Sequence, residues 1–472
     1  MIAFTQSEPS LLSVKRVHMI GIKGAGMAAL AEILSSRGIR VTGSDTSERF
    51  FTDDVLAKRG IKPIEGFDPR NIPQDSDTIV YSTAYKPDTN AELASAFARE
   101  GVRVMSYPEA VGALTRERLS ILVTGTHGKT TTSALLSETL KFLGVDPLAL
   151  VGSKISSWGG NALPGAGLYF VAEADEYQNK FEYYTPWSVL LTSLDWDHPD
   201  FFPDMASYTE VFRKLVSRIP SHGFLVFWGD SAAVLDVAKS ARAEKRSYGF
   251  LPGNDIRISE YAPILEGPFH QSFRLFEGEE DLGTFRLRLA GRHNALNACA
   301  VVTLLRALKF DVDAIRVGME NFFGTARRFE YVGERNGAVI YDDYAHHPEE
   351  IKSTLSAFRE LFPEKNIIAV FHPHTFSRTK ALLPEFAQSF DAADQVAVLD
   401  IYGSARETAG GVSSHEMVTL MNRYSRNKAM YLPTQEDVIA HFSSRVGKDD
   451  LLVTLGAGDV WKIGKELVSV SL

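Results

Sequence analysis

The order of apolar and polar positions divides the chain into three segments, each alternating apolar runs with amphipathic stretches. In the first segment, RVHMIGIKGAGMAALAEILSSRGIRVTGSD (residues 16–45) predicts a strand, a glycine loop, a helix and a second strand. The apolar runs in DTIVYSTA and VRVMSY predict further strands of the same sheet. We therefore expect residues 1–115 to form an α/β domain of ordinary size.

The second and third segments repeat this order. Residues 116–326 begin with the apolar run LSILVT, a glycine loop and the helical spacing of TTSALLSETLKFLG. Later strands are expected in LYFVAEADE, SVLLTSLDWDH and GFLVFWGD, followed by antiparallel alternation over residues 255–289 and a helix in HNALNACAVVTLLRAL. Residues 327–472 predict strands in GAVIYDDYAHHP, NIIAVFHPH, DQVAVLDIYG and DLLVTLGAGD. Ligands gather at the carboxyl ends of strands in open α/β sheets, so the polar residues at these ends are the candidates for chemistry.

Composition excludes several classes of protein. The 472 residues carry a formal net charge of −9, which argues against a nucleic-acid-binding protein. The single cysteine, Cys299, excludes a disulfide framework and a cysteine-rich metal site. No apolar run reaches transmembrane length, and MIAFTQSEPSLLSVKR lacks the features of a secretory signal. We expect a cytoplasmic protein that does not insert into a membrane.

The stretch TGTHGKTTTSALL (residues 124–136) is a candidate phosphate-binding loop between a predicted strand and helix. Val123 stands where the common pattern has its first glycine, so a tight turn with a surface lysine is the alternative. In a phosphate loop, backbone N–H groups at the helix start would cradle the phosphates. Lys129 would reach the terminal phosphates, and the Thr130 hydroxyl would bind Mg²⁺.

Two further clusters accompany this loop. In the first segment Gly21, Gly24 and Gly26 reverse the spacing of the dinucleotide fingerprint, while Asp45 ends the second predicted strand. That pattern favours a diphosphate ligand over NAD. In the second segment EADE (residues 173–176) and DWDHPD (residues 195–200) end successive strands. Their candidate oxygen and imidazole ligands for Mg²⁺ are Glu173, Glu176, Asp197, His198 and Asp200. Solvated turns and a structural histidine are the alternatives.

Six motifs together resemble the Mur ligases, a family of ATP-dependent amide-forming ligases. They are GTHGKTT (125–131), EADE (173–176), DHPD (197–200), GRHNALN (291–297), RRFE (327–330) and DDYAHHP (342–348). The family's ATP loop has the short Gly-x-x-Gly-Lys-Thr form, so Val123 is no defect. GIKGAGM, DDYAHHP, DIYGSARE and LGAGDVWKIG are most similar to the members that join L-alanine to UDP-N-acetylmuramate.

The resemblance implies an α/β fold of three domains and a two-step reaction. A Rossmann-like domain would bind the UDP-sugar, and a central phosphate-loop ATPase would combine a mixed or parallel sheet with a small antiparallel part. A second Rossmann-like domain would bring the amino acid. The muramyl carboxylate would attack the γ-phosphate of ATP, with Mg²⁺ as cofactor, and the amine of L-alanine would attack the acyl phosphate. A monomer or weak homodimer is expected.

Site residues follow from the same resemblance. Catalytic roles are implied for Lys129, His198, Arg328, His347 and Arg378. ATP contacts are implied for Gly125, Thr126, His127, Gly128, Lys129, Thr130, Thr131, His293, Asn294, Asn297, Arg328 and Asp343. The sugar or amino-acid substrate would meet Gly24, Gly26, Asp45, Tyr344, His374 and Arg378, and the metal ligands would be Thr130, Glu173 and His198. His347 or His374, with an ordinary pKa near 6.5, would accept the proton of the amine and make turnover fall below about pH 7.

The chain departs from the family pattern at several positions. Ser193 replaces the usual asparagine, and Thr375 replaces an arginine that would clamp the amino-acid carboxylate. YPEAV (residues 107–111) replaces an arginine-bearing stretch, and Lys214 is either a solvated helix lysine or the carbamylated lysine of some relatives. Two other functions stay open. One is the recycling ligase that attaches a whole tripeptide, and the other is a nicotinamide-dependent sugar-nucleotide oxidoreductase based on GIKGAGM and Asp45.

Overall fold

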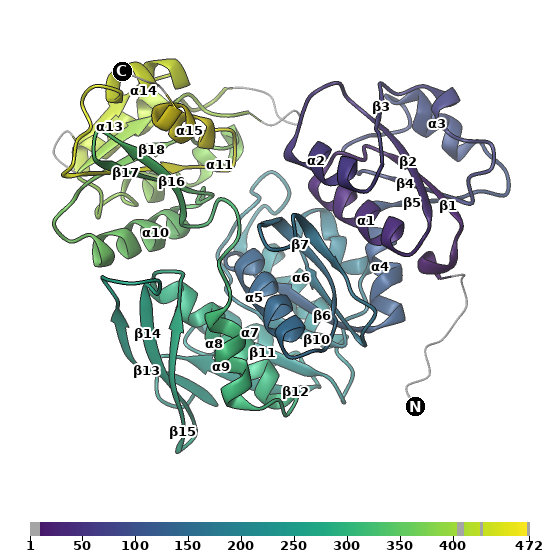
Figure 1. Ribbon diagram of the computed structural model, residues 1–472, viewed down its shortest axis with the longest axis horizontal. Coiled ribbons are helices and arrows are strands. Elements are labelled where there is room, and N and C mark those ends of the chain that lie inside the picture. Colours follow the sequence, from purple (N-terminus) through teal and green to yellow (C-terminus); the bar gives the residue numbers. More distant parts are fainter. Residues whose placement is uncertain (1–9, 404–409, 425–427, 470–472) are drawn as a thin grey trace.

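The computed structural model describes residues 10–403, 410–424 and 428–469, arranged around three separate β-sheets (Figure 1). Residues 404–407 of the DIYGSARE motif and residues 1–9 of the amino-terminal stretch lie outside the described residues. Within the described part of the chain, no helix is long and apolar enough to cross a bilayer. The first and third sheets lie on opposite sides above the central one in this view.

The first sheet has five parallel strands in the order β3-β2-β1-β4-β5. Its strands are β1 (Arg16–Ile20), β2 (Arg40–Asp45), β3 (Ile64–Glu65), β4 (Thr78–Tyr81) and β5 (Arg103–Ser106). Its helices are α1 (Ala25–Ser36), α2 (Phe51–Lys58), α3 (Ala91–Phe97) and α4 (Tyr107–Glu117), with short 3-10 turns η1 (Leu11–Ser13) and η2 (Pro69–Asn71). The predicted strand, glycine loop, helix and strand over residues 16–45 are confirmed, and the sheet has the expected Rossmann-like order.

The central sheet is mixed and has ten strands in the order β15-β14-β13-β12-β11-β10-β6-β9-β7-β8. The strands up to the middle of this segment are β6 (Leu119–Thr124), β7 (Leu148–Ile155), β8 (Gly160–Pro164), β9 (Tyr169–Glu173) and β10 (Ser188–Leu191). The later ones are β11 (Phe224–Trp228), β12 (Glu244–Gly249), β13 (Ile256–Pro263), β14 (Gln271–Glu277) and β15 (Glu280–Leu287). The helical elements are α5 (Lys129–Phe142), η3 (Tyr177–Tyr183), α6 (Met205–Ser217), α7 (Ala232–Ala238), α8 (Arg292–Ala307) and α9 (Val312–Glu320).

The third sheet has six strands in the order β16-β17-β21-β18-β19-β20, parallel except for the β16–β17 hairpin. Its strands are β16 (Glu330–Arg335), β17 (Ala338–Asp343), β18 (Asn366–Phe371), β19 (Gln395–Val398), β20 (Ala429–Tyr431) and β21 (Asp450–Leu455). Its helices are α10 (Pro348–Leu361), α11 (Phe376–Ala381), α12 (Leu383–Ala387), α13 (Ser414–Tyr424), α14 (Gln435–Phe442) and α15 (Trp461–Ser469). The domain boundaries at residues 115/116 and 326/327 stay predictions.

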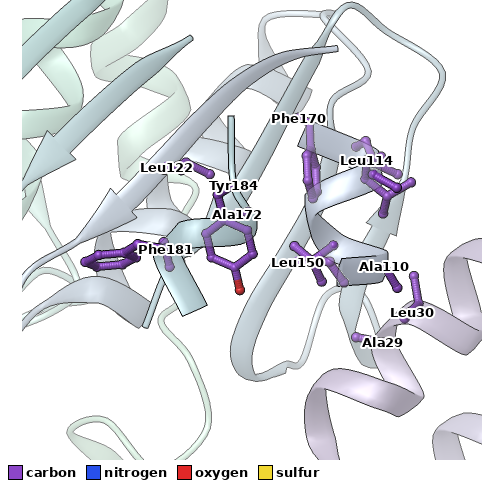
Figure 2. Packing of buried hydrophobic residues seen from close by; sticks show 14 of the residues in the cluster. Ala29, Leu30, Ala110, Leu114, Leu122, Leu150, Phe170, Ala172, Phe181 and Tyr184 are labelled. Carbon is purple, nitrogen blue, oxygen red and sulfur yellow. The ribbon is translucent and has the colours of Figure 1, made fainter. Parts of the chain in front are cut away.

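One hydrophobic cluster joins the first sheet to the central sheet. Leu30 on α1 and Leu114 on α4 belong to the same buried cluster as Leu150, Phe170 and Tyr184 of the central segment (Figure 2). The third sheet instead has its own clusters on its two faces, built around side chains such as those of α10 and α15. Apolar burial is non-directional and scales with area, so the first two segments are held together by one core.

Candidate active site

The loop between β6 and α5 has the conformation of a phosphate-binding loop. Gly125 and Gly128 have φ angles of 128° and 80°, which side chains rarely adopt. A Cβ atom on Gly125 would collide with the Thr192 hydroxyl, and one on Gly128 would lie 2.5 Å from the Asn297 amide oxygen. Ser193 holds the loop, because its carbonyl accepts from the Thr126 N–H and its Oγ from the His127 N–H, both at 2.9 Å. The serine that replaces the family's asparagine therefore has a structural role.

Lys129 begins α5, and its side chain folds back over the loop. Its Nζ donates to the carbonyls of Gly125 at 2.6 Å and Thr126 at 3.1 Å, and lies 3.4 Å from Glu176 Oε2. Burial would lower the pKa of Lys129, but Glu176 and neighbouring carboxylates outweigh burial and raise it. The lysine is thus a partly buried cation beside the backbone N–H groups of the loop.

Two groups of candidate metal ligands lie beside this lysine. The Thr130 hydroxyl donates to Glu173 Oε1 at 3.0 Å, and burial raises the pKa of Glu173. Asp175, Glu176 and His198 offer ligand atoms that all lie within 4.8 Å of one another, the one such group found among the described residues. Thr130 and Glu173 are thus in direct contact, while His198 belongs to the second group.

A cavity of about 350 Å³ lies between the central sheet and the third sheet. This volume is within the range of small-molecule sites, roughly 300–1,000 Å³. The phosphate loop and α8 form one wall, and α10 with the loop before β16 forms the other. Lining residues include His127, Gly128, Thr130, Thr131, Trp228, His293, Asn294, Asn297, Arg328, Phe329, Asp343 and Glu350.

The adenine-side candidates form a hydrogen-bonded group at the start of α8. Asn297 Nδ2 donates to Asn294 Oδ1 at 3.1 Å, and Asn294 Nδ2 lies 3.1 Å from His293 Nε2. Burial lowers the pKa of His293 to about 4, so its ring is neutral near pH 7. Across the cavity, Asp343 accepts the N–H groups of Phe329 and Ala345, each at 2.8 Å, and burial raises its pKa to about 6.

Arg378 forms a buried ion pair across the two sheets. Its Nε donates to Asp197 Oδ1 at 2.8 Å and its Nη2 to Oδ2 at 3.2 Å, while Nη1 lies 3.4 Å from His374 Nδ1. Asp197 follows β10, whereas Arg378 lies on α11. The guanidinium is therefore clamped on one edge, and its Nη1 points toward the histidine.

The aromatic candidates lie around this guanidinium. The side chain of Tyr344 packs beneath two cations, with the guanidinium carbons of Arg327 and Arg328 at 5.0 and 5.2 Å from its ring centre. Burial lowers the pKa of His347 to about 4 and that of His374 to about 3. The expectation of an ordinary pKa near 6.5 for these two histidines is wrong, because burial disfavours the charged ring.

The first-segment candidates lie apart from this cavity's lining. Gly24 caps α1 with its backbone, and Tyr107 at the start of α4 packs so close that a Cβ on Gly26 would lie 2.5 Å from its hydroxyl. Asp45 accepts the Lys23 N–H at 2.6 Å and lies 3.4 Å from the Tyr85 hydroxyl. Asp45 thus braces the glycine loop in this structure.

Sequence reasoning brought most of the cavity residues together but did not identify three acidic partners. Asp175, Asp195 and Glu350 contact candidate residues, although all lie in or next to quoted motifs. The one available signal was Glu350 two residues after DDYAHHP; in the structure its carboxylate lies 3.2 Å from His346 Nδ1. Lys214 is exposed on α6, as the solvated-lysine alternative requires.

Comparisons with known proteins find Mur ligases as relatives in each of the three segments of the chain. Family models match in three parts: "Mur ligase family, catalytic domain" at residues 16–119, "Mur ligase middle domain" at 123–305 and "Mur ligase, glutamate ligase domain" at 327–458. The UDP-N-acetylmuramate–L-alanine ligase of Desulfitobacterium hafniense is 40% identical over 96% of this chain and 99% of its own. That of Treponema pallidum is 36% identical, covering 97% of each chain.

Solved structures show the same fold. A UDP-N-acetylmuramate–alanine ligase from Thermotoga maritima superposes with a TM-score of 0.79 at 24% identity, over 96% of this chain and 98% of that one. A murein peptide ligase from Psychrobacter arcticus gives a TM-score of 0.69 at 22% identity, over 97% of this chain and 100% of that one. Both likenesses extend over all three sheets.

Proposed function

The chain belongs to the Mur ligase family, and on that premise we propose that it is an ATP-dependent ligase joining L-alanine to the carboxylate of UDP-N-acetylmuramate. The product is a precursor of peptidoglycan, made in the cytoplasm. One observation carries the proposal. The phosphate loop opens onto a cavity whose opposite wall, from the third sheet, contributes Arg328, Asp343 and Glu350.

The cavity suits ATP because its walls differ in chemistry. Backbone N–H groups at the start of α5, with Lys129 and Arg328, would stabilise the phosphates, whose negative charge grows on the bridging oxygen during transfer. The amides of Asn294 and Asn297 and the neutral ring of His293 would meet the adenine, and Asp343 would accept a ribose hydroxyl. Arg328 would then sit beside phosphate charge while Asp343 sits at the sugar.

The ligation proceeds in two balanced steps. The muramyl carboxylate oxygen forms a bond to the γ-phosphorus while the bond from that phosphorus to ADP breaks. The amine nitrogen of L-alanine then bonds to the carbonyl carbon of the acyl phosphate, and inorganic phosphate leaves. The amine proton passes to a neutral acceptor, for which the uncharged rings of His347 and His374 are the candidates.

The acidic groups beside Lys129 fit Mg²⁺. Oxygen donors such as the Thr130 hydroxyl and carboxylates are the ligands this ion prefers, and few are needed because it keeps several waters. Thr130 and Glu173 would hold one ion, and His198 with Asp175 and Glu176 a second. When bound, Mg²⁺ withdraws negative charge from the phosphate oxygens.

The test is phosphate release from ATP in the presence of Mg²⁺, UDP-N-acetylmuramate and a series of amines. We expect L-alanine to support turnover, with glycine and L-serine as poorer substrates. Turnover with a tripeptide alone would favour the recycling ligase instead and overturn the proposal. A ligase family leaves no role for a nicotinamide, so the oxidoreductase alternative is set aside.

Lys129→Ala should abolish this phosphate release while leaving UDP-sugar binding nearly intact, because the two ligands begin on different sheets. Lys141→Ala is the matched control, since this lysine lies on the same helix but is exposed. Isothermal titration with the UDP-sugar and the phosphate assay measure the two effects. Wild-type turnover in Lys129→Ala would remove the loop from the mechanism.

A further inference from the structure

His127 belongs to the phosphate loop, yet its ring lies between carboxylates from two different sheets. Nε2 is 3.2 Å from Asp195 Oδ2, in the loop after β10, and Nδ1 is 3.4 Å from Glu350 Oε1 on α10. Both ring nitrogens are buried, and neither makes a well-aligned hydrogen bond, so these contacts are ion pairs. The ring therefore bridges the ATP loop and the third sheet electrostatically.

The charge state of this ring supports the bridge. Burial alone would lower the pKa of His127, but the carboxylates of Asp195 and Glu350 outweigh burial and raise it to about 9. The ring of His347, whose centre lies 4.7 Å away, is neutral at the same pH because burial lowers its pKa. Near pH 7 the site thus holds one charged and one neutral histidine in contact.

Glu350 is the acceptor on the other side of the bridge and has further partners. Its carboxylate lies 3.7 Å from Arg328 Nη1 and accepts the His346 N–H at 3.1 Å. Burial would raise the pKa of Glu350, but His346, His127 and Arg328 hold it well below its ordinary value. Glu350 is therefore an ionised group shared by the phosphate loop, an ATP-side arginine and the amino-acid side of the site.

We propose that His127 is a positioning residue which, through its ion pair with Glu350, couples nucleotide binding in the phosphate loop to docking of α10 and so to amino-acid binding. This inference rests on the proposed function, because that function places ATP and the amino acid on the two sides of the pair. In addition to the backbone contacts of the loop, the side chain of His127 would then respond to the position of the third sheet.

A change in charge transmits the coupling. Phosphates entering the cavity draw Arg328 toward themselves, which leaves Glu350 balanced mainly by His127 and His346. The ion pair between His127 and Glu350 then carries more of the docking, and α10 is held closer to the loop. Thermodynamic linkage requires the converse, that docking of α10 by an amino acid strengthens nucleotide binding by the same factor.

A double-mutant cycle tests the pair without requiring turnover. A non-hydrolysable ATP analogue with Mg²⁺ is titrated calorimetrically into the full chain, as wild type, His127→Gln, Glu350→Gln and the double variant. We expect each single change to weaken analogue binding about five-fold or more, within the usual range of coupling factors. The double variant should bind no more weakly than the weaker single variant. Losses that multiply within two-fold would overturn the pair.

Reciprocity separates coupling from simple damage to the loop. With saturating UDP-N-acetylmuramate, L-alanine should tighten analogue binding about five-fold or more in wild type and hardly at all in His127→Gln. Thr131→Ala, which alters a cavity-lining residue in the first turn of α5, should weaken binding of the analogue but keep that ratio. An equal ratio in wild type and His127→Gln would show a purely structural histidine.

Two further variants keep the outcome readable. Glu364→Gln removes an exposed charge after α10 and should change nothing, whereas Glu350→Asp keeps the charge, withdraws it from the ring and should give a partial loss. If wild type shows no turnover with any amine, the proposed function fails while the analogue cycle still decides the pair. If wild type turns over L-alanine and the cycle is multiplicative, the inference alone fails.

Discussion

At the scale of single residues, Arg378 is the side chain on which we expect selectivity for the amino-acid substrate to depend. Its Nε and Nη2 are occupied by Asp197, and Nη1 is directed at His374. We therefore propose Nη1 as the part of the guanidinium that would meet an incoming carboxylate. Thr375, where the family has a second arginine, caps α11 with a φ angle of 69°. A β-branched residue in that conformation is strained, and it supplies no charge.

Arg378→Ala is expected to raise the KM for L-alanine far more than the KM for ATP. It also leaves Asp197 as an unpaired buried charge, a loss of about 3–5 kcal/mol for a broken buried pair. Steady-state kinetics with L-alanine, glycine and L-serine measure the first effect, and urea unfolding measures the second. An unchanged KM for all three amino acids would contradict the assignment of Arg378 to the amino-acid carboxylate.

Thr375→Arg is expected to lower the KM for L-alanine, because it restores a second cation at a half-buried position. Arginine lacks the branched Cβ, so the backbone at φ 69° accepts it at least as well as threonine. Thr375→Gly is the matched control, since it relieves the backbone without adding charge. An equal fall of KM in both variants would assign the effect to strain rather than to charge.

The pH profile should differ from that of an ordinary histidine. Burial lowers the pKa of His347 to about 4, below its unfolded value near 6.5, so the neutral ring persists as pH falls from 7 to 5. Protonation favours the unfolded chain, and this stabilising contribution is present above pH 6.5 and lost toward pH 4. We expect kcat to stay level down to about pH 5, measured against His347→Gln. A fall centred near pH 6.5 in wild type but not in the variant would contradict this.

At the scale of elements, sequence reasoning predicted those helices, strands and loops that a local pattern of residues specifies. The unit of β6, phosphate loop and α5 was found because apolar spacing and glycine positions specify it within the single stretch Leu119–Phe142. Glu350 was not assigned a role, because its partners His127 and Arg328 become neighbours through docking of α10. The hairpins β7–β8 and β16–β17 were not recognised either, since β7 and β16 each contain a glycine and a register shift that interrupt the alternation of apolar and polar positions.

Contacts between elements also give a stability prediction. Gly112 on α4 lies so close to the Tyr183 carbonyl, at the end of η3, that a Cβ atom would collide with it. Gly112→Ala should therefore lower the free energy of unfolding by about 1–3 kcal/mol, the usual cost of overpacking. Gly447→Ala is the control, because nothing lies within 4 Å of its Cβ position. Equal urea midpoints for the two variants would show that α4 and η3 can move apart without lowering the free energy of unfolding.

At the scale of the whole molecule, the shared core divides the chain unequally. The first two sheets are joined by one hydrophobic cluster, while the third has its own. Differential scanning calorimetry should therefore show two transitions, one for residues up to about 326 and one for the remainder, with an ATP analogue raising both. Three separate transitions would contradict the shared core. The monomer or weak homodimer stays a prediction, which sedimentation would test.

The same shared core also affects how the chain folds while it is being synthesised on the ribosome. Leu30 and Leu114 are made early, but Phe170 and Tyr184, which belong to the same buried cluster, are made roughly 55 residues or more after Leu114. That interval takes several seconds at usual translation rates. During that interval the apolar side chains of α1 and α4 in this cluster lack their packing partners from the central segment. We therefore expect the newly made first segment to need a chaperone. The buried clusters of the third sheet, in contrast, consist of residues from that segment alone.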